Sequence, residues 1–448
     1  MLPSASWYPG SSTMNPTLNP LGNIPTSICP ILVFVEDLPK RLRVTRFIGA
    51  VGFVRFAEAA GHAENNLYNQ RMNRRGALAL LSATVAKGFA KTDRVVIAGA
   101  GIIGASIAYH LVKRGANVTV LEKQRPGAGA TEKSFAWINS FSKQPRPYYD
   151  LNLYGIAGWR RLALEFADLE IQWGGSVQWA TGDEGERMRK TVVRLEQWGY
   201  AAHLVEEREI STLLPAVAPG PVGVACFSEQ EGTLDPMQAL RTLLKNAQKL
   251  GAKVEYPCAV TGISVVGGRV SGVQTTRGTV ETDFLVLAAG VDTPALARMV
   301  QVNVPLKESP GVLAHTAPAA RILDRLAFGP GANIKQNPDG RIVTGTDFGP
   351  AATIDASQEA GEKLLERARR FVPQLKGTRL ETMTLGYRVL PKDDHPIVGF
   401  VDGWPNLYLA AMHSGITLSP LIGQVAAAEI LDGISVDLLR DYRPSRFA

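Results

Sequence analysis

Three glycines and one glutamate stand at the spacing of a dinucleotide-binding motif. Gly99, Gly101 and Gly104 follow the pattern G-x-G-x-x-G, and Glu122 comes later in the chain. In such a motif the first glycine allows a tight turn, the second lets a pyrophosphate approach the backbone, and the third lets a helix pack closely on a strand. An acid about twenty residues further on accepts hydrogen bonds from an unphosphorylated ribose, which makes NADP the least expected nucleotide.

The residues around this loop have the pattern of a strand, a helix and a second strand. Residues 95–97 are consecutive β-branched residues, which is typical of a strand buried on both faces. Ile103, Ile107 and Leu111 then recur at helical spacing, and the apolar run 117–122 (NVTVLE) predicts the second strand. The N-terminus of the helix would offer free N–H groups and the positive end of its dipole to phosphates.

Two later segments bear on which dinucleotide is bound. Residues 127–131 (GAGAT) form a second small-residue loop after the ribose acid, where a long cofactor needs further backbone contacts. Residues 283–294 (DFLVLAAGVDTP) form an apolar strand that closes on small residues. Such a strand can return to the same sheet and pass near the cofactor. The alternative for residues 127–131 is an ordinary turn, and the alternative for residues 283–294 is an unrelated buried strand.

Taken together, these motifs resemble those of a known enzyme family. The two loops, EGTLDP at 231–236, LVLAAG, and the C-terminal GYRVLPKDDHPIVG…NLYLAAMHSGITLSPLIGQVAAAEI occur in the order found in D-amino-acid oxidase, glycine oxidase and sarcosine oxidase. The resemblance covers roughly residues 93–435, and its most specific part is the C-terminal segment. It implies an FAD-dependent oxidoreductase that oxidises the C–N bond of a small amino acid or secondary amine.

The resemblance also implies which residues bind FAD. Val260 would meet the adenine through its backbone, and residues 415–417 would run beside the flavin ring, with a helix beginning near Pro420. The full set implied for the cofactor is Gly99, Gly101, Ile102, Ile103, Gly104, Glu122, Lys123, Gly129, Ala130, Thr131, Val260, Ala289, Gly290, Gly415, Ile416 and Thr417.

Three residues are expected to act in catalysis, and the resemblance implies the first of them. Arg388 would pair with the substrate carboxylate, since a guanidinium grips a carboxylate with two parallel bonds. The alternative for Arg388 is an ion pair with Asp393 or Asp394. His413 would tune the flavin or meet substrate or oxygen, unless backbone groups satisfy it. Tyr387 is the third residue, and it would point to the opposite face from Arg388 if the segment is a strand.

The chain departs from the family pattern at two positions. Relatives usually carry Pro directly after the arginine and Gly after the aspartate, whereas this chain has Val389 and Asp394. The strand direction should survive the change, and the departure bears on the shape of the substrate pocket.

The expected fold class is α/β, with a Rossmann-like FAD-binding domain interrupted by an α+β substrate domain whose sheet is mainly antiparallel. A chain of this length is expected to form more than one core. The FAD-binding domain would comprise residues 91–155, 230–302 and 385–448, and the substrate domain residues 156–229 and 303–384.

Composition narrows the partners. The net charge is +7, but residues 1–90 hold nine Lys and Arg against four Asp and Glu, so the rest carries only about +2. So small a net charge does not give the basic surface expected of a nucleic-acid-binding protein. The cysteines lack metal-binding spacing, so no metal is expected. The electron acceptor would be O2 or a quinone or other carrier. An NAD-dependent dehydrogenase and a non-catalytic FAD-binding subunit are the alternative functions.

Residues 1–90 form an N-terminal extension. From Met72 the segment MNRRGALALLSATVAKGFAKTD has two arginines before a short apolar stretch, which resembles a twin-arginine export signal. The stretch is too short to span a bilayer, so no integral membrane segment is expected. Translation from Met72 would make the enzyme periplasmic, and otherwise a loosely docked arm on a cytoplasmic enzyme is expected.

Overall fold

The computed structural model describes residues 93–345 and 355–447. The expected N-terminal extension, with the twin-arginine-like segment at Met72, lies outside the described residues. All the elements below belong to one compact unit.

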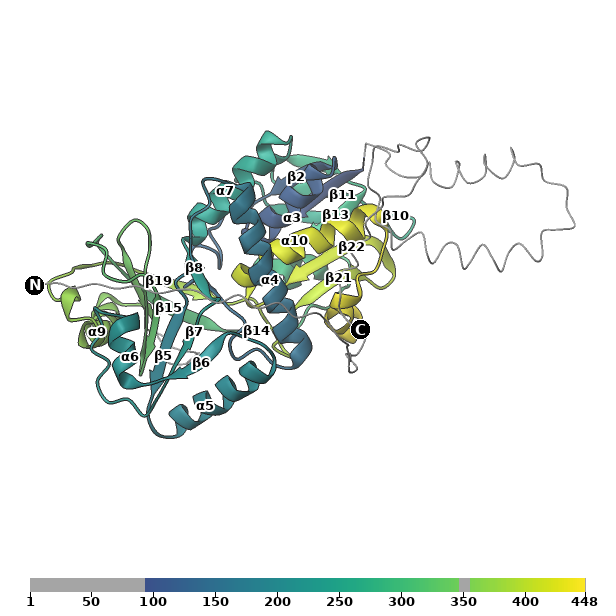
Figure 1. The fold of residues 1–448 in the computed structure, drawn as a ribbon. Helices are drawn as coiled ribbons and strands as arrows, with labels where there is room; N and C mark the ends of the chain where they lie inside the picture. The colour runs from purple at the N-terminus through teal and green to yellow at the C-terminus, as the bar shows by residue number, and fades with distance from the viewer. Residues whose placement is uncertain (1–92, 346–354, 448) are drawn as a thin grey trace, which may run out of the picture. The chain divides into compact units, whose positions relative to one another are not determined.

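The first sheet is six-stranded and almost entirely parallel, with β1 in its interior (Figure 1). The three residues expected to form a doubly buried strand lie in β1 and are at most 1% exposed. Only the pair β21–β22 is antiparallel within this sheet. In spatial order the strands are β21 (Ile397–Val401), β22 (Trp404–Ala411), β13 (Phe284–Leu287), β1 (Arg94–Ala98), β2 (Asn117–Leu121) and β9 (Lys253–Glu255).

Helices and a small sheet cover this parallel sheet. Helix α3 (Ile102–Lys113) packs against both α10 (Gly415–Asp432) and α7 (Pro236–Lys249). A three-stranded antiparallel sheet packs against β13 and β22, and its buried valines share a core with residues of β1 and β22. Its strands are β10 (Val260–Val266), β11 (Arg269–Thr275) and β12 (Gly278–Glu281). This arrangement is the predicted Rossmann-like layer.

The second sheet is eight-stranded and antiparallel apart from the pair β16–β5. The amphipathic helix α9 (Gln358–Phe371) packs on it through its buried Leu364, Leu365 and Ala368. Helix α5 (Gly182–Gln197) packs against β6 and β7, and α6 (Glu207–Leu213) lies between α9 and β5 in the view of Figure 1. In spatial order the strands are β19 (Leu380–Tyr387), β15 (Pro310–Thr316), β18 (Ile342–Gly345), β17 (Ala332–Gln336), β16 (Leu326–Gly329), β5 (Ser176–Ala180), β7 (Val224–Ser228) and β6 (Ala202–Val205).

Shorter elements join the two sheets. Strands β3 (Trp137–Ile138), β8 (Gly232–Leu234) and β4 (Ile171–Gln172) form one small sheet, and β14 (Leu306–Lys307) pairs with β20 (Leu390–Pro391). The remaining elements are α8 (Thr293–Arg298) and the 3₁₀ helices η1 (Gly290–Asp292), η3 (Pro373–Leu375), η4 (Asp437–Tyr442) and η5 (Pro444–Phe447).

Helix α4 (Arg146–Glu165) runs without a break across residue 155, where a domain boundary was expected. It packs against α10, and two glycines permit the close approach. A Cβ added at Gly155 would lie 2.3 Å from the carbonyl oxygen of Thr417, and one at Gly158 would lie 2.7 Å from Cβ of Pro420. The first half of the chain therefore fixes the start of the last long helix.

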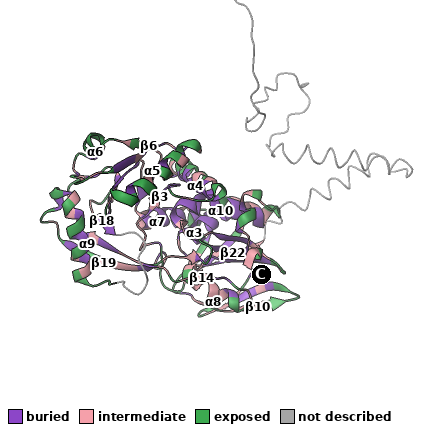
Figure 2. Cartoon of the chain, turned by 90° about the horizontal axis from the view of Figure 1, so that it is seen from below, coloured by how far each residue is buried: buried purple, intermediate pink, exposed green. Residues whose placement is uncertain are grey.

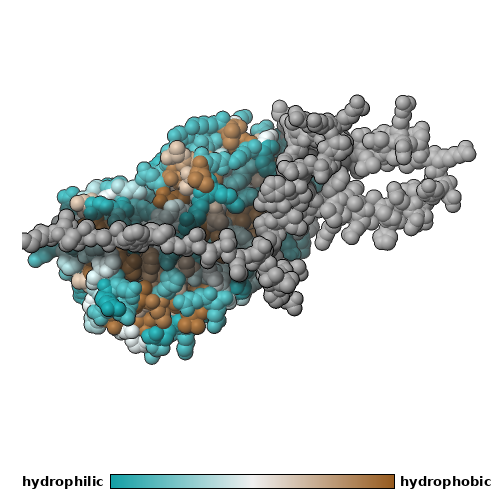
Figure 3. Space-filling view, in the orientation of Figure 1, coloured by the Kyte–Doolittle hydropathy of each residue, from teal (hydrophilic) through white to brown (hydrophobic). Residues whose placement is uncertain are grey.

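Buried residues concentrate in the strands and in α3 and α10, while α5, α6 and the β10–β11 hairpin carry many exposed residues (Figure 2). The described surface in the view of Figure 3 mixes hydrophilic and apolar side chains. Within residues 93–345 and 355–447, no helix combines the length and apolarity needed to cross a membrane.

Candidate active site

The glycine loop after β1 leaves no room for side chains at two positions. Gly99 has φ +109°, and a Cβ there would lie 2.5 Å from the carbonyl oxygen of Ala288 at the end of β13. A Cβ at Gly104 would lie 2.0 Å from the carbonyl oxygen of Gly99, so helix α3 could not approach the loop. Glycine is therefore required by the fold at both positions, for the reasons that the motif predicts.

The second loop packs directly on the first. The Oγ1 atom of Thr131 accepts a hydrogen bond from the backbone N–H of Ile102 at 3.1 Å, in the first turn of α3. The backbone N–H of Gly127 donates to the carbonyl of Ala100 at 3.0 Å. A Cβ at Gly129 would meet nothing within 4 Å, and one at Gly101 would meet only Thr131 Oγ1 at 3.4 Å. Open backbone beside a helix N-terminus suits a pyrophosphate.

Glu122 lies directly after β2 and faces the same loop. Its carboxylate accepts hydrogen bonds from the N–H of Ala100 at 3.0 Å and from the N–H of Gln124 at 2.9 Å. Two donors hold the side chain at the carboxyl edge of the sheet, where a ribose would be recognised. The loops and Glu122 together fit the adenosine diphosphate part of FAD.

The start of α10 differs from the expected helix near Pro420. The helix begins at Gly415, and Pro420 lies inside it. Because proline has no N–H, the carbonyl of Ile416 cannot receive its helical hydrogen bond. It accepts instead from Nε1 of Trp159 at 2.7 Å and from Oγ of Ser419 at 3.2 Å. The helix can thus start five residues earlier than the proline suggested.

The first turn of α10 lies next to the first turn of α3. A Cβ at Gly415 would have only the side chain of Ile103 nearby, at 3.6 Å. Thr417 Oγ1 accepts from the N–H of Asn139 at 3.2 Å and donates to the carbonyl of Trp137 at 3.3 Å. Two helix N-termini and β3 therefore converge where the flavin end of FAD is expected, and both helix dipoles present positive charge there.

Backbone strain is also concentrated near this point. Five described residues other than glycine have positive φ, and three of them are Ala136 (+59°), Ser142 (+57°) and Ser414 (+58°). They flank β3 and precede α4 and α10. Strained backbone of this kind tends to gather at ligand sites, where the surrounding structure holds it in place.

Arg388 directly follows β19 and lies on the face of the eight-stranded sheet toward which a side chain at Gly311 would point. Its Nη1 donates to the carbonyl of Pro310 at 2.6 Å, and a Cβ at Gly311 would lie 2.6 Å from its Nη2. Gly311 therefore makes room for the guanidinium. The two aspartates of the alternative interpretation pair with other cations, Asp393 with Arg446 at 2.8 Å and Asp394 with Lys307 at 2.5 Å.

The register of the sheet places further side chains on the same face as Arg388, which we call the substrate face. Paired residues of neighbouring strands point to the same side, and residues two apart in a strand do as well. In β15 the residues on this face are Gly311, Leu313 and His315. Leu313 pairs with Gly345 of β18, and Gly345 pairs with Asn333 of β17. Asn333 pairs in turn with Phe328 of β16, so Phe328 also lies on the substrate face.

Aromatic residues of the β3 segment cover this face. The ring of Phe328 lies 4.5 Å from the ring of Trp137 and 5.9 Å from that of Phe135, measured between centroids. Tyr387 is paired with Pro310 and so lies on the opposite face, 43% exposed. The structure therefore brings Arg388 to the substrate face but not Tyr387, whose prediction as a catalytic residue it does not support.

Lys335 is a buried cation on the substrate face that the sequence analysis missed. The side chain is 1% exposed, and its Nζ donates to the carbonyl of Leu234 at 2.9 Å and to Oγ1 of Thr233 at 3.3 Å. Burial lowers the pKa of Lys335 to about 7. His315 is in the same cross-strand row, and burial, followed by the charge of Lys335, lowers its pKa to about 4.

A second missed residue is Glu231, whose carboxylate is fully buried behind Trp137. It accepts hydrogen bonds from Nε1 of Trp137 at 2.8 Å, Oγ of Ser176 at 2.6 Å and the hydroxyl of Tyr200 at 2.8 Å. Burial raises the pKa of Glu231 to about 7, although these donors oppose the shift. The EGTLDP motif contained this residue, but nothing in the motif indicated its burial.

His413 lies between β22 and α10, half-buried, with Nδ1 3.5 Å from Oγ of Ser414. Burial, and then the charges of Lys143 and Arg388, lower its pKa to about 3. Burial also lowers the pKa of Lys143 to about 8, against the opposing effect of Glu231. His413, Arg388 and Lys143 therefore share one electrostatic environment, and sequence analysis had identified the first two.

The other predicted positions lie at the edges of the site. Lys123 forms an ion pair with Asp292 at 2.7 Å, and Val260 is the first residue of β10. Ala289 and Gly290 follow β13. Asp394 has φ +67°, which explains the glycine of related sequences, and aspartate tolerates this conformation better than most residues.

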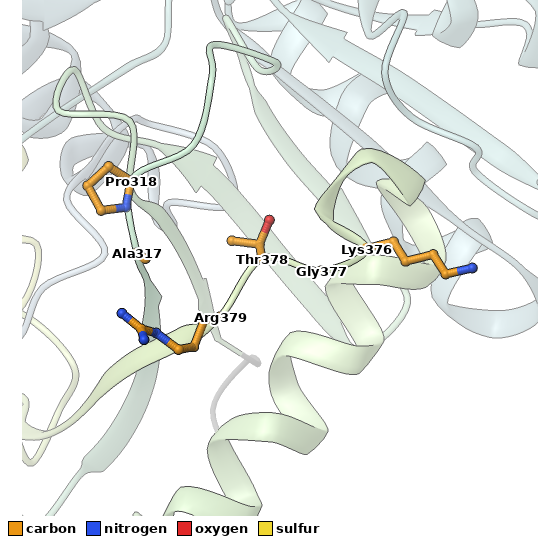
Figure 4. A pocket seen from close by; sticks show the side chains of 6 residues that line it. All are labelled: Ala317, Pro318, Lys376, Gly377, Thr378 and Arg379. Carbon is orange, nitrogen blue, oxygen red and sulfur yellow. The ribbon is translucent and has the colours of Figure 1, made fainter.

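A surface pocket of about 480 Å³ lies elsewhere, at the far end of β15 (Figure 4). None of the predicted site residues lines it. It is bounded by the loop between η3 and β19 and by the residues after β15: Ala317, Pro318, Lys376, Gly377, Thr378 and Arg379.

Comparison with known proteins gives matches over the same part of the chain. A family model described as DAO, FAD dependent oxidoreductase, matches residues 94–429. The chain is 26% identical to mitochondrial sarcosine dehydrogenase of Homo sapiens, covering 89% of this chain and 46% of that protein. It is also 26% identical to glycine oxidase of Bacillus licheniformis, covering 76% of this chain and 93% of that protein.

Among solved structures, glycine oxidase from Geobacillus kaustophilus has a similar fold. The TM-score is 0.73 at 23% identity, over 79% of this chain and 99% of that chain. The present chain thus spans less than half of the human relative's length and nearly all of the two glycine oxidases.

Proposed function

Because this chain belongs to the DAO family of FAD-dependent oxidoreductases, we propose that it oxidises the C–N bond of a small amino acid or secondary amine. The family match confirms the predicted FAD cofactor, the enzyme class and the fold class, and it disfavours an NAD-dependent dehydrogenase. The names of the relatives, sarcosine dehydrogenase and glycine oxidase, support an amine substrate.

The observation that carries the proposal is the position of Arg388. Its guanidinium lies over Gly311 on the substrate face, and its charge acts on His413. A guanidinium so placed can hold a carboxylate in one orientation through two parallel hydrogen bonds. The carbon that bears the amine would then be fixed at one point relative to the start of α10.

FAD, when bound, supplies the hydride acceptor at flavin N5, and the imine produced from the amine is hydrolysed by water. The protein's own residues position and shield the reacting centre. Phe328, Phe135 and Trp137 cover part of the substrate face, and a ligand that displaced water there would strengthen electrostatic contacts. His413 is neutral at pH 7 because its pKa is lowered to about 3, so it adds no positive charge beside Arg388.

The test is the visible absorption spectrum of the purified holoenzyme, recorded without air as small amino acids and secondary amines are added one at a time. We expect one class of amine to bleach the flavin absorption. Recovery on admitting air indicates an oxidase, and recovery only with a quinone or another carrier indicates a dehydrogenase. A bound flavin that no amine bleaches would contradict the proposal and favour a non-catalytic FAD-binding subunit.

A further inference from the structure

Lys143 lies near Tyr148, whose hydroxyl contacts the residue directly before α10. Its Nζ is 5.9 Å from the ring centroid of Tyr148. The hydroxyl of Tyr148 donates to Oγ of Ser414 at 3.1 Å, and that oxygen lies 3.5 Å from Nδ1 of His413. The next residue, Gln144, accepts a contact from the His395 ring at 3.2 Å through its carbonyl. These contacts fix the segment that carries Lys143 against the start of α10.

Two cations therefore act on the same small region. Lys143 and Arg388 are the two positive side chains whose charges act on His413. Within residues 93–345 and 355–447, no carboxylate lies within 4 Å of Lys143 Nζ, whereas many exposed lysines have such a partner. Glu231 acts on Lys143 from farther away, and its carboxylate already accepts three hydrogen bonds.

A substrate with one carboxylate would satisfy only one of these cations. If Arg388 held that carboxylate, the half-buried ammonium of Lys143 would be left without a counter-ion. This is unfavourable in a partly desolvated place. A second anionic group on the substrate would remove that cost by forming a charge-assisted hydrogen bond.

We infer that Lys143 is a second anion-binding residue of the active site, and that the enzyme selects amines carrying two acidic groups, such as N-carboxyalkyl amino acids, over monocarboxylate amines. This inference rests on the proposed function, since it names the substrate class of the same site. Lys143 is a specificity-determining residue here, and Arg388 still holds the carboxylate next to the reacting carbon.

The first experiment compares two substrates that differ by one carboxylate. Anaerobic flavin reduction of the holoenzyme is measured with iminodiacetate and with sarcosine. We expect kcat/KM to favour iminodiacetate by about ten- to hundred-fold, the usual worth of a hydrogen bond to a charged group. Lys143→Met should bring the ratio close to one, and Lys143→Arg should retain most of it.

The matched control is Lys245→Met. Lys245 lies on α7 and forms a surface ion pair with Asp168 at 2.8 Å, as many lysines do. This variant should keep the wild-type ratio. A Lys143→Met variant that slows both substrates equally would overturn the inference and assign Lys143 to the flavin or the electron acceptor instead.

A second measurement does not require turnover. The holoenzyme is titrated with malonate and with acetate while the shift of the flavin absorption is followed. We expect malonate to bind at least about ten-fold more tightly, and Lys143→Met but not Lys245→Met to abolish the difference. Equal affinities in the wild type would overturn the inference. A malonate preference that depends on Lys143, without bleaching by any amine, would uphold Lys143 as a second anion-binding residue while contradicting the proposed function.

Discussion

The glycine loop after β1 and the substrate face of the eight-stranded sheet are built in different ways to hold a ligand. The loop draws on one stretch of chain between β1 and the residue after β2, and it offers backbone N–H groups and one carboxylate. The substrate face collects charged and aromatic side chains from segments as distant as Phe135 and Arg388. We therefore expect substitutions that add volume to impair the loop, and substitutions that change charge to impair the substrate face.

The largest expected effect belongs to the substrate face. Arg388→Ala should lower kcat/KM for the amine by roughly thirty- to several-thousand-fold, because losing a buried charge partner costs about 2–5 kcal/mol. FAD content should not change, since the guanidinium contacts Pro310 and Gly311 rather than the loops. Steady-state kinetics and the flavin-to-protein absorbance ratio measure both quantities. An unchanged kcat/KM would remove Arg388 from the site.

In the glycine loop, Gly104→Ala should destabilise the protein by about 3 kcal/mol or more, because the new Cβ would lie 2.0 Å from the carbonyl oxygen of Gly99. The variant should also lose its bound FAD. Gly129→Ala is the control, since a Cβ there meets nothing within 4 Å of protein. It should leave the melting temperature of the apoprotein unchanged. Equal melting temperatures for both variants would contradict the steric account.

Glu231 accepts a hydrogen bond from Trp137, whose ring packs on Phe328 of the substrate face. Glu231→Gln should cost about 1–3 kcal/mol, because an amide nitrogen cannot accept hydrogen bonds from the donors Trp137, Ser176 and Tyr200. A carboxyl whose folded pKa is raised to about 7 adds stability at low pH, which is lost as pH rises from about 4.5 to 7. The wild type should therefore exceed the variant in melting temperature more at pH 5 than at pH 8. A difference in melting temperature that increases with pH would contradict this prediction.

The smallest effect is expected at the turn after β20. Asp394→Gly should shift the melting temperature by no more than the equivalent of about 1 kcal/mol, since glycine relieves the positive φ of +67° while the exposed pair with Lys307 is lost. The ratio of kcat/KM values between substrates should stay at its wild-type value. A large change in that ratio would show that this departure from the family motif shapes the substrate pocket.

The same contrast explains what could be predicted from the sequence. The strand–loop–helix–strand unit with Glu122 was predictable because its parts are contiguous and each glycine has a local steric reason. Arg388 and His413 were predicted only with the help of the family resemblance. Lys335 and Lys143 were missed because a lysine in a strand or turn is usually exposed, and their burial depends on which strands pair.

Two further differences have definite physical causes. The start of α10 was placed near Pro420 because proline usually marks the first turn of a helix. The indole of Trp159, 257 residues away in sequence, replaces the missing hydrogen bond at Ile416, and no local pattern contains that information. Likewise Tyr387 and Arg388 are adjacent in sequence, but the strand period assigns them to opposite faces, so adjacency to a site residue was a poor guide.

The order of strands in the parallel sheet has a consequence for how the enzyme is made. Strand β13 pairs on one side with β1 and on the other with β22, and α3 packs against α10, so the last fifty or so residues complete a layer that the first described residues began. A nascent chain that stops before β21 leaves β13 as an unpaired edge and α3 partly uncovered, which is a surface prone to aggregation. We therefore expect cofactor loading to wait until β21, β22 and α10 have been made, and truncation before β21 should abolish FAD binding even though the glycine loop is intact.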